Sequence, residues 1–274
     1  MDKKAEKKKK GKVRQLKAHI KQNKVVFGVY VILRALVILA IVLSVIDGRY
    51  ENVFVCVLSL VLFLIPAFIE KNLGINLPTT LEVIILLFIF SAEILGEMSS
   101  YYIRFEWWDT MLHTLNGFLC AAAGFGLVDI INRNEGFKFE LSPLYLAIVA
   151  FCFSMTIGVL WEFFEYFCDI LFKTDMQKDT VINIISSTYI DPTKSNKAVV
   201  IDGIKKVVID GNALPVDGYL DIGLYDTMKD LLVNFIGAVV FCVIGFFYVK
   251  NRGKGKFAKN FIPVINKQKG EDKK

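Results

Sequence analysis

The sequence lacks the local signatures that identify most enzyme classes. It contains no Cys-x-x-Cys pair, no phosphate-binding loop, no dinucleotide-binding glycine fingerprint, no serine-nucleophile elbow and no His-Glu-x-x-His zinc motif. Its five cysteines all fall in apolar segments, so they are predicted to be packing residues and not disulfide partners or thiolate ligands. Any catalytic function must therefore rest on residues that lie far apart in the sequence.

Long apolar segments, in contrast, make up much of the chain. Hydrophobic residues occupy 54% of the 274 positions, which exceeds what one soluble core needs and is typical of a polytopic membrane protein. We expect an all-α fold, a transmembrane helix bundle of about six spans. The fourth segment is rich in glycine and alanine and is expected inside the bundle, with a re-entrant or surface helix as the alternative. The expected spans are 25–46, 52–69, 77–95, 111–131, 144–164 and 231–249.

Lysine and arginine predict the orientation of this bundle. Both ends of the chain are rich in lysine, so we expect basic cytoplasmic tails at 1–24 and 250–274, on either side of a membrane domain at 25–249 in the plasma membrane. The tails are expected to touch anionic headgroups and not nucleic acid. No small-residue cleavage site follows the first apolar segment, which argues against a signal peptide.

One polar insertion, 173–225, separates the last two spans and is expected to be extracytoplasmic. The unit Val-Val-Ile-Asp-Gly occurs in it twice, at 199–203 and 207–211. Two β-branched runs with Asp-Gly turn signals predict a small β-hairpin. Seven aspartates lie in the insertion, but they do not follow the spacing of a calcium-binding loop, so we expect turn chemistry.

Polar residues recur at helical spacing in three spans, each time near the expected outer edge. In the fifth span they are spaced four, three and four, which places them on one helical face. The last span carries a face of acids, an amide and a small residue that permits close helix approach. The fourth opens with tryptophans, followed by an acid and an imidazole one turn apart. The residues are Gly158, Glu162, Glu165 and Asp169; Asp226, Asp230, Asn234 and Gly237; and Asp109, His113, Asn116 and Gly117.

These faces are expected to converge on one pocket, to which the third span adds Glu93 and Glu97. Ionisable groups in hydrocarbon are costly and indicate a functional site by default. Eight carboxyl groups in one vestibule would repel one another, because two charges 4 Å apart interact by roughly 4 kcal/mol at an effective dielectric constant near 20. A divalent cation would compensate the negative charge of these carboxyl groups. Imidazole with carboxylates suits zinc, manganese or iron, and carboxylates with carbonyls suit magnesium or calcium, so the identity stays open.

The sequence suggests a role for each pocket residue. We interpret Asp109, His113, Glu162, Asp226 and Asp230 as metal ligands, and Glu162 or Glu165 as a catalytic general base. Other pocket residues are Glu93, Glu97, Asp169 and Asn234. Helix capping is the alternative for Asp109 and Asp226, and an ordinary interfacial position is the alternative for Glu97 and Asp169.

Three blocks of this sequence resemble the YjdF-like family of polytopic bacterial membrane proteins. They are W-W-D-T-M-L-H-T-L-N-G from position 107, G-V-L-W-E-F-F-E-Y-F-C-D from 158 and Y-D-T-M-K-D-L-L-V-N-F-I-G-A from 225. A more distant similarity is to VanZ-like proteins, which also place D and H early, E in a middle helix and D-x-x-x-N-x-x-G late. The resemblance covers 93–245 and implies a membrane protein with the same pocket residues. It implies no particular reaction, and the long insertion departs from the family pattern.

Three classes of function remain open. The first is a divalent-metal-assisted enzyme acting on an envelope lipid or lipid-linked substrate from the outer leaflet. The second is a transporter or ion-coupled permease, although the acids stop at the outer edge and no inverted repeat is evident. The third is a non-catalytic binding or sensor protein. Membrane lipids are expected partners in all three.

Overall fold

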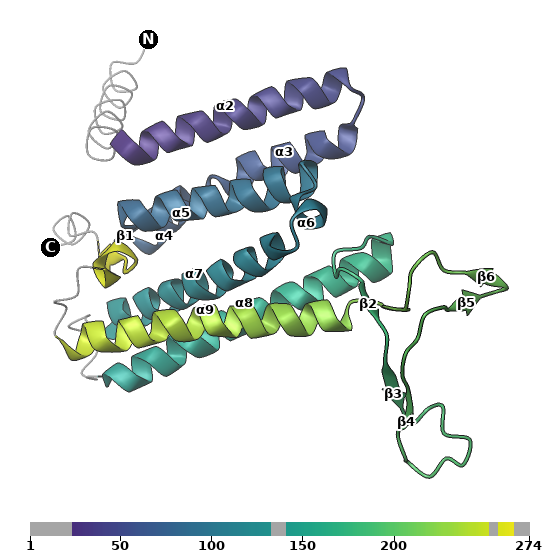
Figure 1. Cartoon of the computed structure of the whole chain (residues 1–274). Coiled ribbons are helices and arrows are strands. Elements are labelled where there is room, and N and C mark those ends of the chain that lie inside the picture. The colour runs from purple at the N-terminus through teal and green to yellow at the C-terminus, as the bar shows by residue number, and fades with distance from the viewer. Residues whose placement is uncertain (1–23, 133–140, 252–256, 266–274) are drawn as a thin grey trace, which may run out of the picture.

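Six long helical segments make up the protein, as the computed structural model of residues 24–132, 141–251 and 257–265 shows (Figure 1). Each is long and apolar enough to cross a membrane. They are α2 (Lys24–Ile46), α3 with α4 (Tyr50–Leu62 and Ile65–Leu73), α5 with η1 (Thr79–Phe90 and Ser91–Met98), α7 (Trp107–Asn132), α8 (Pro143–Phe172) and α9 (Leu224–Lys250). The predicted helical bundle of about six spans is therefore confirmed. Nearly all of the basic tail predicted at 1–24 lies outside the described residues.

Two of the spans change geometry along their length. α3 gives way to α4 close to Pro66, which lacks an amide donor and so suits the first turn of a new helix. α5 continues into η1, a π-helix that carries Glu93 and Glu97. Such wide turns are rare and are frequently found at functional sites. A short helix, α6 (Tyr101–Arg104), then leads into α7.

α8 and α9 are longer than the expected spans. α8 continues to Phe172, beyond the expected end at 164, and α9 begins at Leu224, before the expected start at 231. The acids that made these segments less hydrophobic lie on a single face of each helix, so the helices continue through them with apolar side chains on the other faces.

The bundle has two packed cores, which share one helix. α7, α8 and α9 pack closely around a core that contains Phe125 and Phe241. α2, α3 and η1 pack around a second core with Val37 and Leu86. α5 contributes Leu81 to the first core and Leu86 to the second, so it connects the two groups of helices.

Glycine allows α7, α8 and α9 to approach one another. A Cβ atom at Gly117 would overlap the backbone carbonyl oxygen of Asn234, and a Cβ at Gly237 would overlap that of Thr114. Gly158 of α8 lies against the side chain of Asn234. These contacts agree with the predicted role of small residues, which let membrane helices pack backbone to backbone.

Part of the predicted C-terminal tail, 250–274, folds back onto the bundle. β1 (Ile75–Asn76) pairs antiparallel with β8 (Val264–Ile265). Ahead of β8, η2 (Ala258–Asn260) leads to Phe261 and Ile262, which are buried in the first core. The described part of this segment is therefore packed against the protein at the end of the bundle where α2 begins (Figure 1).

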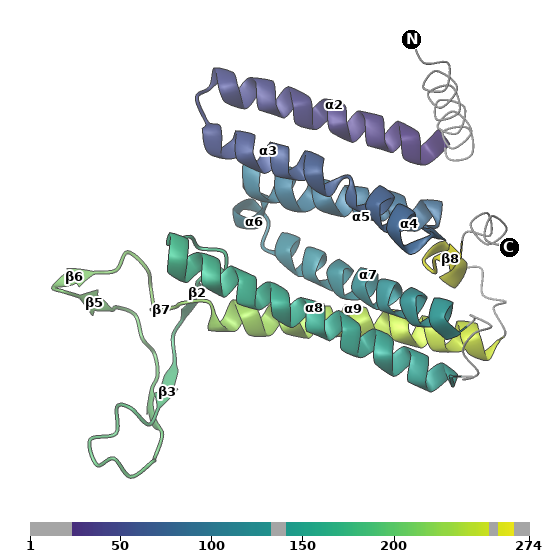
Figure 2. The same ribbon diagram turned by 180° about the vertical axis from the view of Figure 1, so that it is seen from behind.

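The insertion between α8 and α9 extends from the opposite end of the bundle (Figure 2). It consists of short antiparallel strand pairs. β2 (Thr180–Ile182) pairs with β7 (Tyr219–Asp221), β3 (Ile185–Ser187) with β4 (Val199–Ile201), and β5 (Val208–Ile209) with β6 (Asn212–Ala213).

The prediction that the insertion contains a small β-hairpin is confirmed, although the two Val-Val-Ile-Asp-Gly repeats do not pair with each other. The first repeat lies in β4 and the second in β5, and each pairs with a strand outside the repeats. Asp210 and Gly211 both have positive φ, 50° and 82°, and close the turn between β5 and β6, which is the geometry that Asp-Gly favours in a two-residue hairpin. In the first repeat only Gly203 has positive φ, and the chain after it does not double back onto β4.

Candidate functional site

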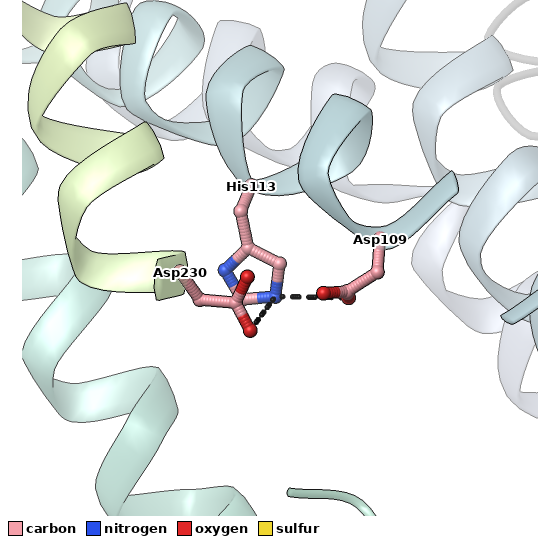
Figure 3. Close-up of side chains that lie close together, drawn as sticks. All are labelled: Asp109, His113 and Asp230. Atoms are coloured by element: carbon pink, nitrogen blue, oxygen red, sulfur yellow. Dashed lines mark ion pairs between the residues drawn. The ribbon is translucent and has the colours of Figure 1, made fainter. Parts of the chain in front are cut away.

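His113 of α7 is surrounded by carboxyl groups from three helices. Its Nε2 atom lies 3.4 Å from Oδ1 of Asp109 and 3.8 Å from Oδ2 of Asp230 (Figure 3). Its Nδ1 atom lies 3.8 Å from Oε1 of Glu162, on α8. Asp109 is one turn before His113 on the same helix, whereas Asp230 comes from α9, which the glycine contacts hold against α7. The imidazole is 11% exposed and the Asp230 side chain 1%.

Asp109, His113 and Asp230 form a ligand group that could hold a metal ion. One ligand atom from each lies within 4.8 Å of the other two. Atoms bound to one ion at about 2.0–2.6 Å are separated by at most about 5 Å, so this spacing fits a shared ion. Among the described residues, Oδ2 of Asp109, Oδ1 of Asp230 and Oε2 of Glu162 are buried without a hydrogen-bond partner. Such oxygens are costly unless a cation or donor compensates them.

Lys229 of α9 is a cation of the site that sequence reasoning missed. Its Nζ atom lies 3.5 Å from Oδ2 of Asp109, 3.8 Å from Oδ1 of Asp226 and 4.0 Å from Oδ1 of Asp230. The side chain is 43% exposed, so it approaches the acids from the solvent side. Its position three residues after Asp226 was a usable signal, because residues at this spacing are neighbours on a helix.

Glu162 and Glu165 of α8 are both buried at the site. Glu162 faces His113, as described above, whereas Oε1 of Glu165 accepts a hydrogen bond from Nε1 of Trp161 at 2.7 Å. Glu165 also lines a small polar pocket of about 40 Å³ with Glu97 and His113. The two glutamates therefore flank the imidazole and are placed to exchange protons near it.

Tyr102, which follows the third span, is a second residue that the sequence analysis missed. It lines the same polar pocket as Glu97 and Asp109. Burial raises the pKa of the Tyr102 hydroxyl, and the charges of Glu97 and Asp109 raise it further. The hydroxyl therefore stays protonated at neutral pH and is available as a hydrogen-bond donor.

Asp169 and Asp226 hold the chain that follows α8. Oδ1 of Asp169 accepts from the Met176 amide at 2.7 Å, and Oδ2 accepts from the Gln177 amide at 2.9 Å. Oδ2 of Asp226 accepts from the Lys178 amide at 2.7 Å. Asp169 thus anchors the start of the insertion and lies outside the ligand group. Asp226 combines a similar anchor with its contact to Lys229.

Asn234 lies among α7, α8 and α9 and is fully buried. Its Oδ1 atom accepts from Nδ2 of Asn116 at 3.1 Å, and its Nδ2 atom lies 3.6 Å from the sulfur of Met155. These contacts engage both ends of the amide, so Asn234 ties the three helices together next to the acids.

Comparison with family models places the chain among membrane proteins. A model described as "Predicted membrane protein (DUF2238)" matches residues 29–251. The chain belongs to the DUF2238 family. No curated protein and no solved structure matches it. The matched range includes all six spans in whole or in large part, and every residue of the site.

The structure of this DUF2238 protein divides the expected pocket residues into groups. It brings Asp109, His113, Glu162, Asp226 and Asp230 around one centre, with Lys229 beside them. Glu165 and Glu97 line the adjoining polar pocket, and Glu93 lines a neighbouring apolar cavity. Asp169 and Asn234 hold the surrounding chain. The imidazole nitrogen and the carboxylates at this centre are of the types that could hold a metal ion.

Proposed function

We propose that this DUF2238 protein is a divalent-metal-assisted enzyme that acts on an amphiphilic envelope substrate. The observation that carries the proposal is the ligand group of Asp109, His113 and Asp230, whose ligand atoms lie within 4.8 Å of one another. Buried carboxylate oxygens without hydrogen-bond partners in this group support a bound cation. One nitrogen and two carboxylates favour zinc, manganese or iron over calcium.

The proposed reaction is hydrolysis. Asp109, His113 and Asp230 would hold the ion, which would supply an activated water when bound. Glu162 or Glu165 would take up the proton of that water as it attacks an ester bond of the substrate, and would return a proton to the departing alcohol. The proximity of both glutamates to His113 supports this assignment.

We place the site on the outer side of the plasma membrane. The lysine-rich ends of the sequence predict cytoplasmic termini, and the ligand group lies in the first two turns of α7 and α9, which begin at the end of the bundle that carries the insertion (Figure 1). The substrate would therefore be a lipid or lipid-linked molecule of the outer leaflet. Membership of the YjdF-like family and similarity to VanZ-like proteins remain predictions that agree with the same residues.

Thermal unfolding of the detergent-purified protein tests the metal centre. After treatment with EDTA, addition of Mn²⁺ or Zn²⁺ is expected to raise Tm, since a ligand at 100 times its Kd stabilises by about 2.7 kcal/mol. His113→Ala and Asp230→Asn should lose this increase. Glu51→Gln, which changes an exposed acid at the start of α3, should retain it. Equal increases in Asp230→Asn and the unchanged protein, or none with any divalent ion, would reject the centre.

Turnover is tested separately in proteoliposomes that contain a total envelope lipid extract. Mass spectrometry should detect cleavage products that depend on the added metal and that disappear in Glu162→Gln and His113→Ala. A protein that binds the ion but yields no metal-dependent product would instead be a binding or sensor protein.

A further inference from the structure

An apolar cavity of about 240 Å³ lies beside the ligand group, inside the bundle. Its walls come from four of the candidate spans, namely the second to the fifth, and from Tyr102. Most of its surface is apolar and is contributed by Leu62, Ile65, Phe88, Ala92 and Leu112. A cavity of this kind suits a hydrocarbon group and offers little to water.

Three residues connect this cavity to the polar pocket. Tyr102, His113 and Trp161 line both spaces. A molecule with an apolar end in the cavity would therefore place its adjoining polar atoms next to His113. This arrangement of a mostly apolar site with a few convergent polar groups is typical of ligand pockets.

Trp161 also lines a groove at the surface of the bundle. This groove of about 220 Å³ is lined by Ile157, Leu160, Trp161 and Asn116. Leu160 is 55% exposed and Trp161 43%, as expected for side chains that face lipid. Because Trp161 and Asn116 line both the groove and the cavity, a side-chain movement between α7 and α8 would join the two spaces.

We propose that the cavity binds one aliphatic chain of a membrane amphiphile, which enters from the lipid between α7 and α8, past Trp161. This proposal rests on the proposed function and names the substrate class of the same site. The volume is below the range of about 300–1,000 Å³ that is typical of pockets for drug-sized ligands. The cavity therefore has room for one aliphatic chain and not for two.

The polar groups of the site favour a head that carries hydroxyl groups. Four carboxyl groups surround the centre, and Glu165 and Glu97 line the adjoining pocket. Carboxyl oxygens accept hydrogen bonds, so hydroxyl groups of the head can donate to them. The Tyr102 hydroxyl, which lines both the cavity and the polar pocket, can in turn donate to an oxygen of the head.

Photo-crosslinking tests the chain site without metal. The probe is an alkyl glucoside with a diazirine at the end of its chain, added in EDTA to the detergent-purified protein, with peptide mapping by mass spectrometry. Adducts are expected on cavity residues such as Phe88 and Leu112. Ala92→Leu, which adds bulk to the cavity wall, should reduce the yield of these adducts at least about tenfold, and Leu62→Trp is a second variant, from α3. Ala123→Leu is the matched control, because Ala123 is exposed on α7.

The outcomes separate this proposal from the metal centre. Cavity adducts of equal yield in Ala92→Leu, Leu62→Trp and the unchanged protein would overturn the chain site, even if metal binds. Adducts confined to the cavity would support the chain site, even if no ion shifts the Tm of the protein. An alkyl phosphate probe with the same chain should label the cavity less than the glucoside does. Equal or stronger labelling by the phosphate would overturn the choice of head group.

Discussion

Lys229 of α9 places its ammonium group 3.5 Å from the Asp109 carboxylate of α7. This carboxylate oxygen, Oδ2, is buried and has no hydrogen-bond partner among the described residues. The ammonium thus lies where a metal ion would also reduce the negative charge. We infer that Lys229 and a divalent cation compete for the same carboxylates.

Replacing Lys229 with methionine is expected to strengthen the binding of a divalent cation. The attraction between the Lys229 ammonium and the Asp109 carboxylate at 3.5 Å would be several kcal/mol at an effective dielectric constant near 20. The Lys229 side chain is 43% exposed, however, so solvent screening reduces this attraction to about 1 kcal/mol. Lys229→Met should therefore lower the Kd for Mn²⁺ about fivefold, as measured by titration calorimetry. Lys205→Met, in the exposed insertion, is the control. Weaker binding by Lys229→Met would contradict the competition.

Gly117→Ala is expected to destabilise the bundle. The added methyl group would overlap the backbone of Asn234 and push α7 away from α9, at a cost of about 1–3 kcal/mol. Gly28→Ala on α2 is the matched control, since no atom lies within 4 Å of its added Cβ, and alanine is the better helix former by up to about 1 kcal/mol. Thermal unfolding in detergent measures both. A similar loss of stability in the two variants would reject the close contact.

The turn around Asp191 should resist mild acid. Its carboxylate accepts hydrogen bonds from the amide and hydroxyl groups of Thr193 and Ser195, and these bonds lower the pKa of Asp191 below its ordinary value. A carboxyl group with a lowered pKa stabilises the folded protein fully at pH values above about 3.9, which is the pKa of aspartate in the unfolded chain. This stabilisation is lost as the pH falls through the lower pKa of the folded state.

Hydrogen exchange measured as pH falls tests this turn. Protection of the Thr193 and Ser195 amides, corrected for intrinsic exchange rates, should persist below about pH 4. In Asp191→Asn the protection should be weak at every pH. Asp202→Asn is the control, because among the described residues the Asp202 carboxylate accepts a hydrogen bond only from the adjacent Gly203 amide. Loss of protection already at about pH 5 would contradict the lowered pKa.

The orientation of the bundle is tested by cysteine labelling. Tyr189 in the insertion is 98% exposed, so Tyr189→Cys should react with a membrane-impermeant maleimide in intact cells. Asn72→Cys, at the end of α4, should react only after permeabilisation, because α4 ends at the opposite end of the bundle (Figure 1). The reverse pattern would place the ligand group in the cytoplasm and reject an outer-leaflet substrate.

Much of the candidate site was predictable from helical spacing. The interval of four residues between Asp109 and His113 predicted their contact, and the spacing of the α8 acids predicted that Glu162 and Glu165 share a face. The structure shows the contact between Asp109 and His113, and it buries both Glu162 and Glu165. Spacing within one helix could not distinguish Asp169, which anchors the insertion, from the acids that face His113, because that distinction depends on where the next segment of chain lies.

The sequence by itself determined that this is a six-span helical membrane protein with acidic faces on several helices. Hydrophobic length and helical periodicity are local properties, so they can be read without knowing any contact between helices. Only the tertiary structure decided that Lys229 shares the centre, that Trp161 lines both the cavity and the neighbouring groove, and that the two repeats of the insertion pair with other strands. These features depend on how closely the backbones of α7, α8 and α9 approach and on strand partners distant in sequence, neither of which local periodicity specifies.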